Sequence, residues 1–346
     1  MKRISLILIT SLLTLGLTSC SSEGAPTQLL AHIVLLDISG SSSNSIGTFS
    51  SENHSPSSLS ERKNQLEEKI RNAIAQKTAI YFGFVRKSYG QTEIATLVPA
   101  SLILEIESVL KEDILNEKLL DEAEKGISKA WGVAIDQERS KSNSCSSDEV
   151  VRTISSTSGG NVNVESAGRL ARKLCSGARN SIYQFNQLQG TSKDKISPKD
   201  KGTSKDKIGP KDIGSDIQAA VDRSLQKLAS DALRLINSDG KPVALIPTVF
   251  LVSDLIQISG GQSKASQVFK LANPSDACTL AKNDSETFKP TFQGSASLVS
   301  DGFAGSIKEV NSANRDKLME YWKCWFETRN IMDIDIGAKG IDLGGL

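Results

Sequence analysis

Three short oxygen-bearing side chains alternate in the segment "DISGS", where Asp37, Ser39 and Ser41 follow a run of aliphatic residues. Gly40 lets the chain turn sharply there, so the three side chains can converge just past the end of a strand. One carboxylate, two hydroxyls and retained water suit a hard divalent cation, Mg²⁺ or else Mn²⁺ or Ca²⁺. The alternative is an ordinary serine-rich turn in which Asp37 caps a backbone amide.

Two further residues could bring oxygen ligands to the same place. Asp254 ends a second aliphatic run, "VALIPTVFLVSD", and Ser215 opens the clearest helical pattern in the chain. Ser215 also forms an N-cap and capping-box pattern with Gln218, which accounts for a serine there without any ligand. Asp254 equally suits the first polar turn residue after a strand. The tetrapeptide "LVSD" recurs and ends at Asp301, a competitor to Asp254, which we prefer because its strand is stronger and directly follows the helix.

The elements that must position these residues alternate between strands and helices, which predicts an α/β fold with a doubly wound, mostly parallel sheet flanked by helices. In such a sheet, ligands bind at the carboxyl ends of the strands. Strands are expected at Leu29 to Ser39, Thr78 to Val85 and Thr92 to Pro99 (these two as a hairpin), Val243 to Asp254, Ala296 to Gly302, and weakly at "IMDIDIG". Helices are expected from Ser58 to about Gln76, as one or two over Ser101 to about Arg139, within Leu170 to Leu188, from Gly214 to Ile236 and from about Ser312 to Arg329.

Two segments carry no periodicity that would predict a packed element. Ser142 to Ser166 is rich in Ser, Asn and Gly and is expected to be a mobile loop, except where Cys145 pins it. Gly190 to Lys201, "GTSKDKISPKDK", is repeated almost unchanged as Gly202 to Ile213. With one Ile per copy it cannot bury a core, so we expect a solvated, duplicated loop.

The first twenty residues predict export. Lys2 and Arg3 precede an apolar run and the segment "LTSC", a pattern typical of a signal peptide and too short for a comfortable membrane span. It resembles the bacterial lipoprotein signal, which implies that Cys20 is lipidated and that the chain is anchored to a membrane in the cell envelope, outside the cytoplasm. The predicted organisation is a signal peptide at 1–19, a tether at 20–28 and one domain at 29–340, with insertions at about 101–189 and at 190–213.

Four cysteines remain after Cys20, which is compatible with two disulfides in an exported chain. They are Cys145, Cys175, Cys278 and Cys324, and the sequence leaves all three pairings open. No CxxC spacing occurs, which argues against a zinc site.

The composition narrows the function classes. The 346 residues are 38% hydrophobic and 23% charged, and 41 basic residues balance 40 acidic ones, so no net field favours nucleic acid. His32 and His54 are the only histidines, one expected in or beside the first strand and the other in a loop. Neither has an evident general-base partner, and phosphate-loop and nucleophile-elbow motifs are absent, so we expect no enzyme.

The order of these motifs resembles the von Willebrand factor A-type (VWA) domain and its metal-ion-dependent adhesion site. That site uses D-x-S-x-S after the first strand, a Thr in a G-T-D-like loop and an Asp after a later strand; "DISGS", "GSD" and "VSD" match here, with Ser215 in place of Thr. The resemblance covers roughly Leu29 to Ile258. It implies that the hydroxyls of Ser39, Ser41 and Ser215 contact Mg²⁺ directly, whereas Asp37 and Asp254 act largely through water.

An ion held in this way keeps an exchangeable coordination position. The resemblance therefore implies metal-dependent adhesion or complex assembly with a protein partner that offers an acidic side chain, without a small-molecule cofactor. Two alternatives stay open: a metal-free scaffold lipoprotein with a degenerate site, and a Mg²⁺-dependent hydrolase or phosphoryl-transfer enzyme. The aromatic segment "YWKCWF" is expected to pack the last helix on the sheet.

Overall fold

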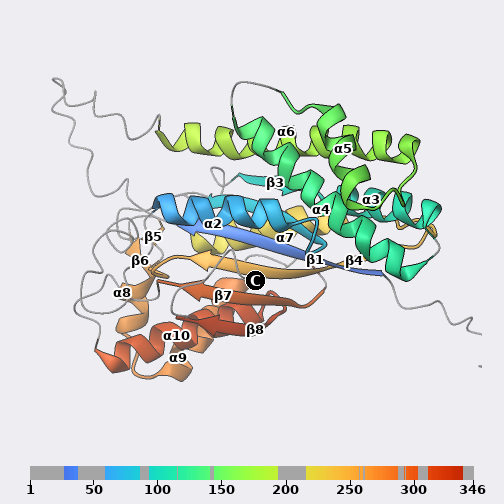
Figure 1. The fold of residues 1–346 in the computed structure, drawn as a ribbon. Coiled ribbons are helices and arrows are strands. Elements are labelled where there is room, and N and C mark those ends of the chain that lie inside the picture. The colour runs from blue at the N-terminus through green and yellow to red at the C-terminus, as the bar shows by residue number, and fades with distance from the viewer. Residues whose placement is uncertain are drawn as a thin grey trace, which may run out of the picture.

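A computed structural model describes residues 27–37, 59–85, 93–114, 116–140, 144–193, 216–256, 258–259, 262–286, 292, 294–302 and 311–337. Its centre is a six-stranded sheet with strand order β3-β2-β1-β4-β7-β8, flanked by helices (Figure 1). The strands are β1 Thr27–Asp37, β2 Thr78–Val85, β3 Ile94–Val98, β4 Val243–Val252, β7 Ala296–Asp301 and β8 Ile331–Ile336. Within this sheet every pairing is parallel except that of β2 with β3, which forms the predicted antiparallel hairpin. Two short strands, β5 Ile258–Ser259 and β6 Gln262–Ser263, form a separate antiparallel pair.

The strand order places a topological switch point between β1 and β4. The chain moves outward from β1 through β2 to β3, and then returns to the other side of β1 and continues through β4 and β7 to β8. The carboxyl ends of β1 and β4 lie side by side, since Leu36 pairs with Val252. Open α/β sheets bind ligands in the crevice at such a point. The predicted doubly wound, mostly parallel sheet is therefore confirmed.

Helices cover both faces of the sheet, which explains why its central strands are almost continuously apolar. Successive residues of a strand point to opposite faces. On one face, Lys69 lies over the ring of Phe250, 4.7 Å from its centroid. On the other, burial and then the charge of Asp231 raise the pKa of Tyr81. Lys69 belongs to α2 and Asp231 to α7, so these two helices cover opposite faces of the sheet.

The helices are α2 Leu59–Asn72, α3 Ala100–Asp113, α4 Glu117–Arg139, α5 Ser147–Thr157, α6 Val164–Lys193, α7 Ile217–Ala232, α8 Lys264–Phe269, α9 Pro274–Ser285 and α10 Ser312–Glu327.

The insertion between β3 and α7 contains four packed helices, α3 to α6 (Figure 1). It joins the rest of the fold through Trp131, whose indole N–H donates to the carbonyl of Ile70 at 2.7 Å, and through Ser181, whose hydroxyl donates to the carbonyl of Leu97 on the edge strand β3. Both donor side chains are buried. The insertion therefore covers the β3 edge of the sheet.

The expectation of a mobile loop over Ser142 to Ser166 is wrong. Its central part, Ser147–Thr157, is α5, and α6 begins inside it at Val164. Val150 and Ile154, four residues apart, are fully buried in the core, so tertiary packing outweighs the low helix propensity of the Ser and Thr residues around them. A disulfide between Cys145 and Cys175 ties the start of the segment to α6.

The tail completes the sheet and one helical layer. The two strands predicted after residue 295 are β7 and β8. The aromatic residues of α10 are buried as predicted, with Trp322 and Trp325 fully enclosed. A second disulfide joins Cys278 of α9 to Cys324 of α10. The two disulfides are typical of proteins that reside in an oxidising compartment. Among the residues described, no helix has both the length and the apolar character needed to cross a bilayer.

Two predicted helices are shorter than expected. The helix expected to reach Gln76 ends at Asn72, and a turn follows in which Lys77 has a positive φ of 49° before β2 begins. The helix expected over Gly214 to Ile236 is α7, Ile217–Ala232. Leu233, the C-cap, is 89% exposed, whereas Leu235 beyond the end of the helix is still buried in the core.

Candidate metal centre

Two predicted ligands, Asp37 and Asp254, lie at the switch point. Asp37 is the last residue of β1, and Asp254 follows β4 by two residues. Both are fully buried, at 0% exposure. Buried carboxylates are rare unless they are hydrogen-bonded, paired or bound to a metal ion. Their position at adjacent carboxyl ends is the one from which the sequence predicted a common site.

Ser253 connects these two strands, and sequence reasoning missed it. Its hydroxyl donates to Oδ2 of Asp37 at 2.7 Å, and its backbone amide donates to the carbonyl of Asp301 on β7 at 3.0 Å. Ser253 is 2% exposed. The one feature of the sequence that could have pointed to Ser253 is its place in "VSD", directly before Asp254. Nothing local, however, indicates a partner 216 residues away.

The turn after Ser253 is tightly held. The amide of Leu255 donates to Oγ of Ser253 at 3.1 Å, and the amide of Ile256 donates to Oδ1 of Asp254 at 2.9 Å. Leu255 has a φ of 58°, in the left-handed region that a bulky residue seldom adopts. Its carbonyl accepts a 2.8 Å hydrogen bond from the indole of Trp322. Such strain persists only where the surroundings enforce it, and it clusters at functional sites.

The N-terminus of α7 belongs to the same edge of the sheet. Asn237, just past the end of α7, donates to Oγ1 of Thr27 at the start of β1, at 2.8 Å. The C-terminal end of α7 therefore lies at the amino ends of the strands. From there the helix extends back over 16 residues, about 24 Å at 1.5 Å per residue. Its first residues therefore lie toward the carboxyl ends of the strands, where Ser215 was predicted to contribute.

The predicted capping role of Ser215 is wrong. Asp216 is the N-cap, and its side chain accepts from the amide of Ala219 at 3.0 Å. Burial raises the pKa of Asp216, an effect that this hydrogen bond opposes. The side-chain amide of Gln218 donates to the hydroxyl of Tyr321 at 2.8 Å. Because Asp216, one residue closer to the helix, is the N-cap, helix capping does not explain why residue 215 is a serine.

Three predicted ligands, Ser39, Ser41 and Ser215, and the predicted lipidation site Cys20 lie outside the described residues. Their positions relative to Asp37 and Asp254 stay predictions. The competitor Asp301 ends β7 directly opposite Val252 and is partly exposed. Asp254 follows the strand that borders the switch point, whereas Asp301 lies one strand further out, so the fold favours Asp254.

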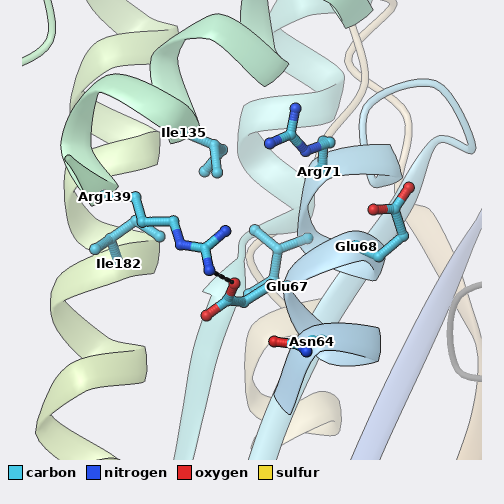
Figure 2. Close-up of a pocket in the computed structure, with 8 residues that line it drawn as sticks. Asn64, Glu67, Glu68, Arg71, Ile135, Arg139 and Ile182 are labelled. Carbon is cyan, nitrogen blue, oxygen red and sulfur yellow. Dashed lines mark ion pairs between the residues drawn. The ribbon is translucent and has the colours of Figure 1, made fainter. Parts of the chain in front are cut away.

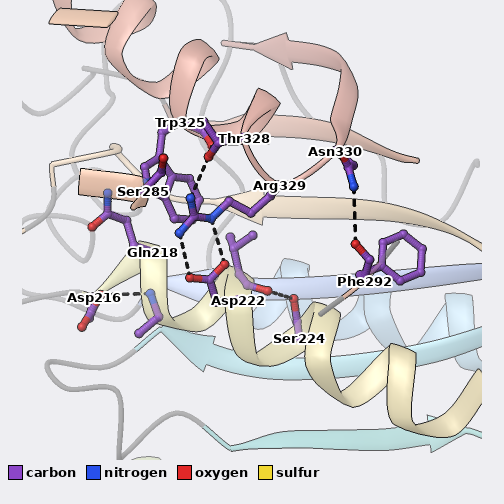
Figure 3. A network of polar contacts seen from close by, with 12 residues as sticks. Asp216, Gln218, Asp222, Ser224, Ser285, Phe292, Trp325, Thr328, Arg329 and Asn330 are labelled. Carbon is purple, nitrogen blue, oxygen red and sulfur yellow. Dashed lines mark hydrogen bonds and ion pairs between the residues drawn. The ribbon is translucent and has the colours of Figure 1, made fainter. Parts of the chain in front are cut away.

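A polar network fixes α7 against the tail (Figure 3). Arg329, 1% exposed, donates to both carboxylate oxygens of Asp222 on α7, at 3.0 and 3.2 Å. Its guanidinium also lies 4.1 Å from the ring centroid of Trp325. Burial raises the pKa of Asp222, and the hydrogen bond and charge of Arg329 oppose that rise. The helix that carries the predicted Ser215 ligand is thereby anchored from inside the core.

Other groups with chemical potential do not join this site. His32 points to the opposite face of β1 from Asp37, and burial, followed by the charge of Lys69, lowers its pKa to about 3. Cys278, Glu320 and Cys324 lie close together, but the two cysteines form a disulfide and offer no thiolates.

A cavity of about 300 Å³ opens between α2, α4 and α6, and Figure 2 shows the residues that line it. Its arginines are engaged in ion pairs, Arg139 with Glu67 at 2.9 Å and Arg71 with Asp136. None of the predicted site residues lines this cavity. It therefore contributes nothing to the candidate metal centre.

The donor set at the switch point consists of oxygen atoms, which fits a hard divalent cation rather than a soft metal. Asp37 and Asp254 would help to hold the ion, and Ser253 donates a hydrogen bond to Asp37. No protein-family model matches this chain, and no curated protein matches its sequence.

Proposed function

We propose that this chain is a lipid-anchored, extracytoplasmic protein with a VWA-like domain that binds a divalent cation and, through it, a carboxylate of a protein partner. The observation that carries the proposal is the pair of fully buried carboxylates, Asp37 and Asp254, at the switch point of a doubly wound sheet. The ion, Mg²⁺ or else Mn²⁺ or Ca²⁺, would supply a positively charged, exchangeable coordination position.

The proposed ligands differ in how they reach the ion, and this difference determines the net charge that the ion keeps. In the proposed site the hydroxyls of Ser39, Ser41 and Ser215 contact the ion, and Asp37 and Asp254 act largely through water. Few anionic groups then touch the ion, so it keeps net positive charge with which to attract a partner's carboxylate. The duplicated segment at 190–213 was predicted to be all loop, but its first four residues belong to α6. It ends directly before this region in sequence, and we propose that it modulates partner access.

Calorimetric titration of the full-length chain with Mn²⁺ and with Mg²⁺ tests the ion site. Asp37→Asn keeps the size and an acceptor for Ser253 but removes the charge, and it should abolish binding. Asp254→Asn should do the same, whereas Asp301→Asn, the matched control on the neighbouring strand, should bind as the unaltered chain does. A chain that binds neither ion would instead favour the metal-free scaffold alternative.

Partner recognition has its own test. A chain loaded with Mn²⁺ should retain peptides that carry an exposed Glu or Asp and release them in EDTA, and the Gln and Asn counterparts of those peptides should not be retained. Retention that survives EDTA would contradict recognition through the ion.

The anchor is tested separately in cells. Radioactive palmitate should label the unaltered chain and leave a Cys20→Ala variant unlabelled, and the variant should leave the membrane fraction. Equal labelling of both would refute lipidation at Cys20.

A further inference from the structure

We propose that Ser253 is a positioning residue for the metal site, an inference that rests on the proposed function. Its hydroxyl links the Asp37 carboxylate to the turn that carries Asp254: it donates to Asp37 on β1 and accepts from the amide of Leu255. One buried oxygen thereby sets the relative positions of groups that come from two strands.

The bond to Asp37 controls the orientation of its carboxylate. The last torsion of an Asp side chain is broad and roughly two-fold, so burial alone does not fix the plane of the carboxylate. A hydroxyl that donates to Oδ2 at 2.7 Å fixes it. Partners of this kind behind a metal ligand orient the ligand and tune the affinity for the ion.

The bond from Leu255 controls the turn. Leu255 is buried and has a positive φ of 58°, a conformation that its own side chain disfavours. Its amide is held by Ser253, and its carbonyl by Trp322. Removing the Ser253 hydroxyl would release one of these two holds, so the turn that presents Asp254 would be free to relax.

The neighbouring strand offers a matched control. Ser300 of β7 is fully buried, like Ser253, but its hydroxyl has no hydrogen-bond partner among the residues that the structure describes. It pairs with Leu251, two residues before Ser253, and therefore lies on the same face of the sheet. Ser300→Ala removes an equally buried hydroxyl that orients neither carboxylate.

The experiment is a titration of the full-length chain with Mn²⁺, followed by the electron paramagnetic resonance signal of the free ion. Ser253→Ala should lose about 10- to 100-fold in affinity, the range typical of a lost partner behind a ligand. Ser300→Ala should match the unaltered chain. Ser253→Thr and Ser253→Val, which have the same shape and differ in the hydroxyl, should separate, with Thr the tighter binder. If Ser253→Ala does not fold, the comparison of the Thr and Val variants tests whether the hydroxyl sets the affinity for Mn²⁺.

The outcomes separate the two proposals. If the unaltered chain binds Mn²⁺ but Ser253→Ala binds equally well, or if the Thr and Val variants bind alike, Ser253 is an ordinary core residue and only the positioning role is overturned. If the unaltered chain binds no Mn²⁺, the metal site itself is refuted and this inference falls with it. A purely structural role would lower the free energy of unfolding of Ser253→Ala while leaving the affinity of its folded form unchanged.

Discussion

The buried ion pair between Arg329 and Asp222 should be the most sensitive electrostatic contact that links α7 to the tail. In Arg329→Met, a long apolar side chain fills most of the arginine's volume, so the loss reports charge rather than a cavity. Asp222 would be left buried without its cation, because it is only 7% exposed. Removing one partner of a buried pair typically costs about 3–5 kcal/mol in the free energy of unfolding.

An exposed pair of the same type supplies the control. Arg71 and Asp136 form an arginine–carboxylate pair through two nitrogen atoms, with side chains that are 39% and 49% exposed. Because water screens such a pair, Arg71→Met should cost about 1 kcal/mol or less. Urea unfolding followed by tryptophan fluorescence measures both variants on the same scale.

The loss in Arg329→Met should also depend on pH. Burial already raises the pKa of Asp222, and the variant removes the two effects of Arg329 that oppose this rise. A carboxyl whose folded pKa lies above its unfolded value contributes stability that is full below the unfolded pKa and is lost as pH rises through the folded pKa. The variant should therefore differ least from the unaltered chain near pH 4 and most at pH 7.

Replacing both partners, in Asp222→Leu with Arg329→Met, should recover much of the loss, because neither charge is then buried. The reasoning is refuted if Arg329→Met loses no more free energy of unfolding than Arg71→Met, or if its loss is the same at pH 4 and pH 7.

Three further predictions concern the disulfides, the buried histidine and the duplicated loop. Replacing Cys278 and Cys324 by Ala should lower the free energy of unfolding by about 4 kcal/mol, given their separation of 46 residues; a loss near zero in urea unfolding, or peptide mapping that joins either cysteine elsewhere, would contradict the pairing. Because the pKa of His32 is lowered to about 3, the unfolded chain takes up a proton below pH 6.5 that the folded chain refuses. Stability should then fall by up to about 1.4 kcal/mol per pH unit as pH drops from 6.5 toward 3, and His32→Leu should remove that slope, which acid titrations of unfolding will show. Deleting Gly190 to Lys201 should leave urea unfolding unchanged, because the second copy supplies the same "GTSK" that closes α6, while Mn²⁺-dependent partner binding changes; a chain unfolded by the deletion would refute a purely surface role for the loop.

The local pattern of apolar residues in the sequence predicted much of the fold. The aliphatic runs that end at Asp37 and Asp254 predicted the two central strands, and the neighbouring runs Thr78 to Val85 and Thr92 to Pro99 predicted the hairpin of β2 and β3. Periodicity succeeded there because a strand buried on both faces needs apolar residues throughout. It failed at Val150 and Ile154, where two apolar residues among Ser and Thr suffice for a helix once neighbouring helices cover them.

The sequence by itself determined which residue types could bind an ion and that they follow strands in an α/β chain, because side-chain chemistry and hydrophobic periodicity are local properties. Only the tertiary structure decided which groups meet. The strand order put β4 beside β1, selected one cysteine pairing out of three, and brought Ser253 to Asp37 and Arg329 to Asp222 across 216 and 107 residues. Such contacts depend on how the chain returns on itself, which no local pattern of residues encodes.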